Sequence, residues 1–501
     1  QQEITQQESG SQLTELELIA SHHRTDPGIH DYHDYSDIGT DSQFLCPRLT
    51  SAPQGCGSQL HAENPDVQNP DVQNPDVQNP AILESLPILE HIGLLQQQID
   101  SLSQSQNPAT LALAYRTLGN FYRDCIEQGE GTAEHLTIAI QAYEQALQWL
   151  PDRSLEQAET LNDLGSLYWM VAQLQQGEEA IVCLQQTTRL YQQSLEGIDP
   201  EAQPHLYASV QNNLGATYAD LARYQDTCQN LQQSIAAYRR VLQYRAAPTD
   251  PIRYASTQNN LGTTYWNLAQ HQQPELNLKQ AIHAYSEALR YHDPQHEPLN
   301  YAMIQNNLGT AFWNLAQYEQ PHLYLQQALT AYHDALQYRS LEAAPAGYAA
   351  TQNNLGTAYW HLTHHTDGTE KRHSLQQSII AYESTLKAVE VLRMEGLTPL
   401  NFDLASTYHN LGLVYGEFAL TQDSEPLDHP DRAIRAGLEK SLYYHQLALQ
   451  EWKNDTDLRQ AAFNAILQTL RAAYTHLGLI GQNHFLSQLP SELLSEVLSR
   501  L

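Results

Sequence analysis

The segment QNNLGTTYWNLAQ, residues 258–270, returns as QNNLGTAFWNLAQ at residues 305–317 and as QNNLGTAYWHL at residues 352–362. A shorter copy, QNNLGATYADLA, occupies residues 211–222. The glycines of these copies, Gly215, Gly262, Gly309 and Gly356, follow one another at intervals of 47 residues. A fixed period of this length is typical of stacked copies of one supersecondary unit. We therefore expect a repeat array rather than several unrelated domains.

Each copy contains two apolar stripes with helical spacing. In the copy around Gly309, the first stripe predicts a helix over residues 299–317, and the second runs from Leu325 to Leu336. Pro321 interrupts the chain between them, and a loop with Pro345 leads into the next copy. Each unit is therefore a helical hairpin whose apolar faces need neighbouring units.

The repeated glycine lies in the middle of the first helix, where it costs about 1 kcal/mol relative to alanine. We expect this cost to be offset by close approach of the second helix. The expected contacts are small residues, and the expected fillers between helices are large ones. The small residues are Ala281, Ala288, Ala328 and Ala335, and the fillers are Tyr285, Tyr332 and Tyr382.

These positions resemble the tetratricopeptide repeat. One copy reads Leu261, Gly262 and Tyr265, then Ala281, Tyr285 and Ala288, and the next reads Leu308, Gly309 and Phe312, then Ala328, Tyr332 and Ala335. The family's usual period is 34 residues, so the longer period and the Asn-Asn doublet look like the long-repeat subclass typified by kinesin light chains. The resemblance implies an all-α fold, a right-handed α-solenoid of stacked helical hairpins. It also implies that the first helices line a concave groove where extended peptides bind.

Less regular copies flank the regular ones. Gly119, Gly165 and Gly412 mark three of them, and in the last copy Arg471 replaces the glycine. We assign residues 105–480 to seven hairpins and a degenerate eighth. Caps are expected at both ends, because a solenoid exposes its terminal units. Apolar residues at helical spacing predict a capping helix over 81–104, and residues 481–501 are expected to close the array with Ser491 as an N-cap.

Residues 1–80 differ from the rest, because they contain few branched apolar residues and include NPDVQNPDVQNPDVQNP at residues 64–80. They are expected to form a disordered tail and an extended spacer. Imidazole and carboxylate groups in this tail could bind a divalent metal, but solvated disorder is the favoured interpretation and no metal or cofactor is expected. These groups belong to His22, His23, His30, His33, Asp26, Asp31 and Asp34.

The formal net charge is −32, from 57 acidic and 25 basic residues. Such a chain repels nucleic acid phosphates and anionic lipid, so neither is expected as a partner. The five cysteines form no C-x-x-C pair, which fits a reducing compartment. No apolar run is long enough to cross a bilayer, and the opening QQEITQQ is not a signal segment. We therefore expect a cytoplasmic protein without membrane insertion.

The candidate binding residues lie on the first helix of each unit. One lies three residues before the glycine, and the others lie one, four and five residues after it. Offsets of three and four share one helix face. An Asn amide can pair with the backbone of an extended peptide, and Trp is enriched at interface hot spots. The alternative, which stays open, is that the Asn side chains join adjacent repeats and the Trp side chains fill gaps. The candidates are Asn162, Asn212, Asn259, Asn306, Asn353, Thr263, Thr310, Thr357, Trp169, Trp266, Trp313, Trp360, Asn267, Asn314 and His361.

Only the first unit has basic groups on this face. These are Arg116 and Arg123, with Asp124 beside them, and they are a possible anion-binding site. Known arrays that bind a C-terminal carboxylate use Lys and Arg here, whereas the regular units carry Asn, Thr and Trp. We therefore do not expect this mode of capture in the regular units.

No catalytic motif is present, neither G-x-S-x-G, nor a phosphate-binding glycine loop, nor H-E-x-x-H. The leading hypothesis is a non-enzymatic scaffold or adaptor that binds an extended peptide or a partner protein. A second hypothesis is a regulatory sensor acting on a separate effector. A third is a metal-dependent enzyme that uses the His/Asp tail. The identity of the partner and the oligomeric state do not follow from the sequence.

Overall fold

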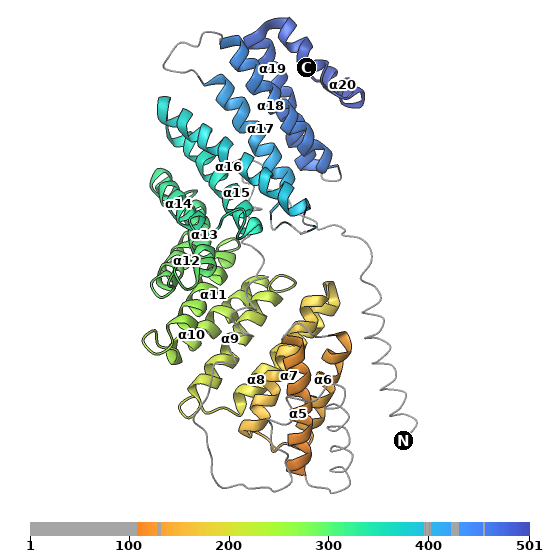
Figure 1. Cartoon of the computed structure of the whole chain (residues 1–501), viewed down its shortest axis with the longest axis vertical. Coiled ribbons are helices and arrows are strands. Elements are labelled where there is room, and N and C mark those ends of the chain that lie inside the picture. The colour runs from red at the N-terminus through yellow and green to blue at the C-terminus, as the bar shows by residue number, and fades with distance from the viewer. Residues whose placement is uncertain are drawn as a thin grey trace. The chain divides into compact units, whose positions relative to one another are not determined.

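The computed structural model describes residues 108–127, 132–394, 396, 400, 402–421, 430–453 and 456–501 (Figure 1). The tail predicted over residues 1–80, with its His/Asp run, and the capping helix predicted over 81–104 lie outside these residues. The described residues belong to two compact units, 108–170 and 171–501.

The first unit contains a helical hairpin. Helix α5 (Pro108–Glu127) packs against α6 (Ala133–Leu147), and most of α7 (Leu155–Leu174) follows. Thr132 begins α6 as an N-cap, because its side chain accepts a hydrogen bond from the backbone N–H of His135 at 3.2 Å. Helix α7 continues from this unit into the second.

In the second unit, helices that are neighbours in sequence are neighbours in space, from α8 on α9 through to α18 on α19. Every regular element of the described residues is a helix. The expected fold class, an all-α solenoid of stacked helical hairpins, is confirmed. The helices are α8 (Gly177–Glu196), α9 (Pro204–Leu221), α10 (Thr227–Tyr244), α11 (Pro251–Ala269), α12 (Pro274–Leu289), α13 (Pro298–Leu315), α14 (Pro321–Leu336), α15 (Pro345–Leu362), η1 (Thr363–His365), α16 (Gly368–Met394), α17 (Leu404–Leu420), α18 (Pro430–Glu451), α19 (Thr456–Leu486) and α20 (Ser491–Leu498).

Proline begins many of these helices. The helix predicted over residues 299–317 is α13, Pro298–Leu315, and Pro321 is the first residue of α14. Proline suits this position because the first turn needs no N–H donor and its φ is already helical. Proline thus separates the two helices of a hairpin by starting the second one.

The repeated glycines bring the two helices of each hairpin together. A Cβ atom at Gly262 would lie 2.8 Å from the ring of Tyr285, and one at Gly309 would lie 2.7 Å from Tyr332. The close approach is confirmed, but its partner is the tyrosine ring and not Ala281 or the other alanines. The flat ring lies against a backbone that carries no side chain.

The C-terminal end is less regular. Helix α19 contains a kink at Gly478 (φ 68, ψ −172). The prediction that Ser491 is an N-cap is wrong, because α20 starts at Ser491 itself and Pro490 occupies the cap position without a side-chain hydrogen bond. Leu493 and Val497 of α20 pack into an apolar cluster with residues of α18 and α19. None of the described helices is long and apolar enough to cross a membrane.

Candidate functional site

The predicted asparagines three residues before each glycine are buried. Asn162 and Asn212 are 4% exposed, Asn259 is 6% exposed, and Asn306 and Asn353 are 1% exposed. A partner could therefore not reach these amides while the repeats stay stacked. Their contacts lie within the chain.

These asparagines join adjacent repeats in the second unit. Asn354 Nδ2 donates to Asn306 Oδ1 at 3.2 Å, and Asn307 Nδ2 approaches Asn259 Oδ1 at 3.5 Å. At the next boundary Thr407 Oγ1 donates to Asn353 Oδ1 at 2.8 Å. At two boundaries the first asparagine of one doublet is thus the acceptor, and the second asparagine of the next doublet is the donor.

The threonines after the glycines are also buried and bond to the tyrosine that covers the glycine. The Tyr285 hydroxyl donates to Thr263 Oγ1 at 3.0 Å, and the Tyr332 hydroxyl donates to Thr310 Oγ1 at 3.2 Å. In the next unit Thr357 Oγ1 and the Tyr382 hydroxyl lie 2.8 Å apart. The threonines therefore orient the tyrosine rings within each hairpin.

The tryptophans divide into two groups. Trp266 and Trp313 are each 5% exposed, whereas Trp169 and Trp360 are half-buried. The indole nitrogens of Trp266 and Trp360 are buried and have no hydrogen-bond partner among the described residues. An unpaired N–H in such a place is costly.

The predicted polar residues five positions after the glycine differ in exposure. Asn267 and His361 are half-buried, and Asn314 is 9% exposed. In the described structure the Asn314 amide donates to the Thr310 carbonyl at 2.9 Å. Asn267 and His361 therefore remain as polar groups that solvent can reach.

His361 belongs to an aromatic cluster at the C-terminal end of α15. Its ring centroid lies 5.2 Å from that of Trp313 and 5.5 Å from that of Trp360, and His364 is 6.2 Å away. Burial, assisted by His364 and His365, lowers the pKa of His361 to about 4. The imidazole is therefore neutral at physiological pH. Sequence analysis missed His364 as a member, although its spacing of three residues from His361 places both on one helix face.

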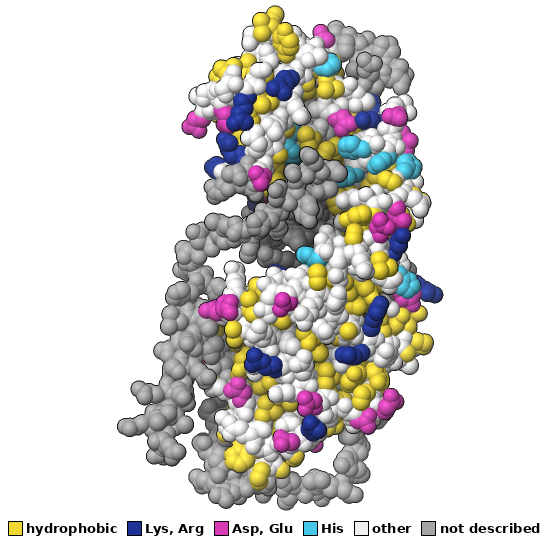
Figure 2. All heavy atoms as spheres, turned by 180° about the vertical axis from the view of Figure 1, so that it is seen from behind, with side chains coloured by type: hydrophobic (Ala, Val, Ile, Leu, Met, Phe, Trp, Pro, Cys, Tyr) yellow, Lys and Arg dark blue, Asp and Glu magenta, His cyan; other side chains and the backbone are white. Residues whose placement is uncertain are grey.

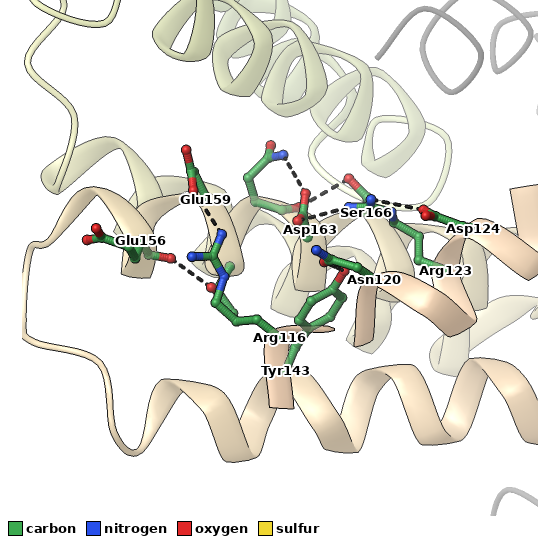
Figure 3. Close-up of polar contacts among 11 residues, drawn as sticks. Arg116, Asn120, Arg123, Asp124, Tyr143, Glu156, Glu159, Asp163 and Ser166 are labelled. Atoms are coloured by element: carbon green, nitrogen blue, oxygen red, sulfur yellow. Dashed lines mark hydrogen bonds and ion pairs between the residues drawn. The ribbon is translucent and has the colours of Figure 1, made fainter. Parts of the chain in front are cut away.

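The two arginines predicted as an anion-binding site, Arg116 and Arg123, are paired with carboxylates (Figure 3). Arg116 Nη2 lies 2.8 Å from Glu159 Oε2, and Arg123 Nη1 lies 2.9 Å from Asp163 Oδ2. Arg123 Nη2 also bonds to Asp124 Oδ1 at 3.1 Å. Burial raises the pKa of Asp163, although Arg123 opposes this shift. The pairs join α5 to α7, and an acidic ligand could bind these guanidinium groups only by displacing Glu159 or Asp163.

Within the described part of the chain, no group of three or more His, Cys, Asp or Glu residues is placed to hold a metal ion. The His/Asp run of the tail lies outside the described residues.

A family model of the tetratricopeptide repeat matches residues 208–247, which contain most of α9 and all of α10. No curated protein sequence matches the chain. Among solved structures, a circular tandem repeat protein with novel repeat topology is 16% identical, with 78% of this chain and 96% of that chain covered and a TM-score of 0.28.

A signal transduction ATPase of the STAND class with a tetratricopeptide repeat sensor, from Pyrococcus horikoshii, is 12% identical. The match covers 84% of this chain and 55% of that chain, with a TM-score of 0.39. Human IFIT1, as a dimer with PPP-AAAA, is also 12% identical, with 77% and 94% coverage and a TM-score of 0.22. These likenesses are too remote to indicate a ligand.

The assignment depends on the family match and on the chain's own repetition. The Gly215–Tyr238 contact inside the matched segment recurs as Gly262–Tyr285 and Gly309–Tyr332 outside it. Repeats of this family generally mediate protein–protein interaction, and their fold is typically non-catalytic. The kinesin-light-chain likeness stays a prediction. Residues 208–247 are thus similar to a tetratricopeptide repeat, and the neighbouring hairpins repeat the same glycine–tyrosine contact.

Proposed function

We propose that this protein is a non-enzymatic scaffold that binds an extended peptide, or an extended segment of a partner protein, along the first helices of its repeats. The observation that carries the proposal is the half-buried polar position five residues after the glycine, which is Asn267 in one repeat and His361 two repeats later. Both are half-buried, so a partner can reach them, and both are held on rigid helices.

The chemistry of this surface suits a peptide backbone. An extended segment presents alternating N–H and C=O groups, and an Asn amide offers both a donor and an acceptor. Asn260, half-buried on α11, and Asn267 make no side-chain hydrogen bond within the described residues. The Trp360 indole N–H adds a buried donor, and its ring adds apolar area at low rotamer cost. The remaining candidates, Asn259, Asn306 and Asn353 with the threonines, would act by holding the helices in register.

The proposed partner is a protein and not a nucleic acid. A formal net charge of −32 opposes binding to phosphate backbones. On the face seen in Figure 2, basic side chains are interspersed with acidic, neutral and apolar ones. The non-enzymatic role is supported by the match to a repeat whose fold is typically non-catalytic.

The test is selection of peptides from a random phage-displayed library on the immobilised full chain. Affinities of the selected peptides are then measured for Asn267→Ala, His361→Ala and Trp360→Ala. Each variant should weaken binding by about 1–2 kcal/mol if it lies in the contact surface. Gln326→Ala, an exposed position on the second helix α14, serves as the matched control and should leave affinity unchanged.

Single-stranded DNA of random sequence is the second arm and should not bind at physiological salt. Selected peptides whose affinity responds to Gln326→Ala but not to the three first-helix variants would refute the proposed surface. Tight DNA binding would refute the choice of partner class.

A further inference from the structure

The repeat formed by α17 and α18 differs from the regular repeats at two buried positions. Three residues before its glycine, where the regular repeats have Asn, it has His409. Over the glycine, where they have Tyr, it has His445: a Cβ atom at Gly412 would lie 2.6 Å from His445 Cε1. Two positions that form hydrogen bonds in the regular repeats are thus both occupied here by histidine, whose ordinary pKa lies near neutral pH.

The two imidazoles contact each other, and neither makes a side-chain hydrogen bond to another described residue. Their ring centroids are 5.0 Å apart at an interplanar angle of 54°. His409 is 9% exposed and His445 is 1% exposed, and the Nδ1 atoms of both are buried without a hydrogen-bond partner. In the repeats around Gly262, Gly309 and Gly356 the tyrosine hydroxyl has a threonine partner, but Leu413 occupies that position in this repeat. The pair therefore occupies an apolar environment.

Charged groups on the elements packed around the pair form ion pairs and hydrogen bonds with other residues. On α17 itself, Asp403 Oδ2 accepts from Trp452 Nε1 at 3.1 Å, and the Trp452 ring lies 5.5 Å from His409. From α15, the uncharged Asn353 faces Thr407. Several charged groups on the neighbouring helices pair with one another. On α16, Glu383 accepts from Tyr415, Lys371 pairs with Glu417, Arg372 donates to the Thr421 carbonyl, and Arg393 lies at Tyr408. Lys440 on α18 donates to Glu383 and Tyr415, Arg459 on α19 pairs with Glu496, and His484 on α19 pairs with Glu439 on α18.

A proton on either ring would therefore lack a counter-charge among the described residues. Burial lowers the pKa of His409 to about 4, and it lowers the pKa of His445 well below its ordinary value, with His409 adding to the shift. At neutral pH both rings are neutral. In mild acid the native pocket resists a proton that an opened repeat would accept.

We propose that the His409–His445 pair makes the C-terminal end of the array acid-labile, so that mild acid opens the α17/α18 hairpin and releases α19 and α20. Release of α19 and α20 is expected because α18 packs directly against α19. Leu438 and Leu442 of α18 form one apolar cluster with Phe463 and Phe485 of α19, and Ser441 lies 3.2 Å from Thr469. The repeats formed by α11–α14 lack the pair and should stay closed at the same pH. The inference concerns the stability of the array and does not depend on the proposed function.

The test is amide hydrogen exchange of the full chain, read by mass spectrometry at about pH 7 and about pH 5 and corrected for intrinsic exchange. Protection in α17–α20 should fall roughly ten-fold or more on acidification, while α11–α14 should change much less. The triple variant His409→Asn, Leu413→Thr and His445→Tyr installs the residues of the regular repeats and should abolish the difference.

His364→Gln with His365→Tyr is the matched control, because it installs the counterparts Gln317 and Tyr318 of the preceding repeat at two exposed positions. It removes two histidines and should leave the acid response of α17–α20 unchanged. Equal acid opening in the triple variant and the wild type would overturn the proposal.

If the triple variant does not fold, a second measurement on the wild-type protein tests the proposal. Hydrogen exchange at the imidazole Cε1 position reports the pKa of each histidine by mass spectrometry. Depressed values for His409 and His445, together with acid opening confined to α17–α20, support the proposal. Ordinary values near 6.5 for both rings would overturn it.

Discussion

Asn354 Nδ2 donates a hydrogen bond to Asn306 Oδ1 at 3.2 Å, and the two residues are separated by 48 positions of the chain. The bond crosses from one repeat to the next. Asn306 is 1% exposed, so its acceptor has no access to water. In a linear array, the free energy of unfolding is approximately the sum of the stabilities of the single repeats and of the interfaces between them. The Asn306–Asn354 hydrogen bond contributes to one of these interfaces.

Asn306→Ala should lower the free energy of unfolding by about 1–3 kcal/mol, because it leaves the Asn354 amide without its partner in a half-buried site. Urea unfolding followed by circular dichroism measures the loss. Gln326→Ala, on an exposed face, should stay within about 0.5 kcal/mol of the wild type. If the two variants were equally stable, the Asn306–Asn354 hydrogen bond would contribute nothing to the interface between repeats.

Gly262→Ala should destabilise the protein, although alanine is the better helix former by about 1 kcal/mol. Its Cβ atom would lie 2.8 Å from the Tyr285 ring, and overpacking of this kind costs about 1–3 kcal/mol. Adding Tyr285→Leu should recover part of the loss, because it removes the ring. A double-mutant cycle by thermal unfolding tests this coupling, and strict additivity would contradict it.

Gln320→Gly should stabilise the protein by up to about 1 kcal/mol, because the left-handed conformation costs a non-glycine residue about 1–2 kcal/mol and glycine loses somewhat more entropy. Gln320 has φ 42 immediately before α14, and Gln273 has φ 47 before α12. At the starts of α8 and α16 the chain already has glycines with positive φ, Gly177 and Gly368. Thermal unfolding measures the gain, and Gln320→Ala, which keeps the strain, should show none.

His361→Asn should make the protein less sensitive to acid. Because the pKa of His361 is lowered from 6.5 to about 4, the unfolded chain binds a proton that the native protein does not, so stability falls as the pH decreases through this window. The full effect is at most about 3 kcal/mol. Urea unfolding at several pH values between these limits should show a shallower pH dependence for the variant. The same slope in both proteins would contradict a buried neutral imidazole.

The period of 47 residues was sufficient to predict an all-α repeat array and the pairing of helices within it. It could do so because each apolar stripe needs a neighbour, and a fixed period allows only the adjacent copies to provide one. The glycine in mid-helix likewise indicated a close approach, since nothing else offsets its cost. The partner of that glycine was mistaken, because spacing along a helix does not say which side chain of the facing helix reaches the backbone.

The candidate binding residues on the first helices show more clearly what the sequence alone could not predict. From sequence, Asn259, Asn267, Trp266 and Thr263 have equivalent claims to bind a partner, because all are polar or aromatic residues on the first helix. The stacking of neighbouring repeats decides between them: it buries Asn259 against Asn307, places Thr263 under Tyr285, and leaves Asn267 within reach of solvent. Local periodicity determines which residues share a helix face, but exposure depends on how closely the next unit packs, and that distance is set only when the whole array is assembled.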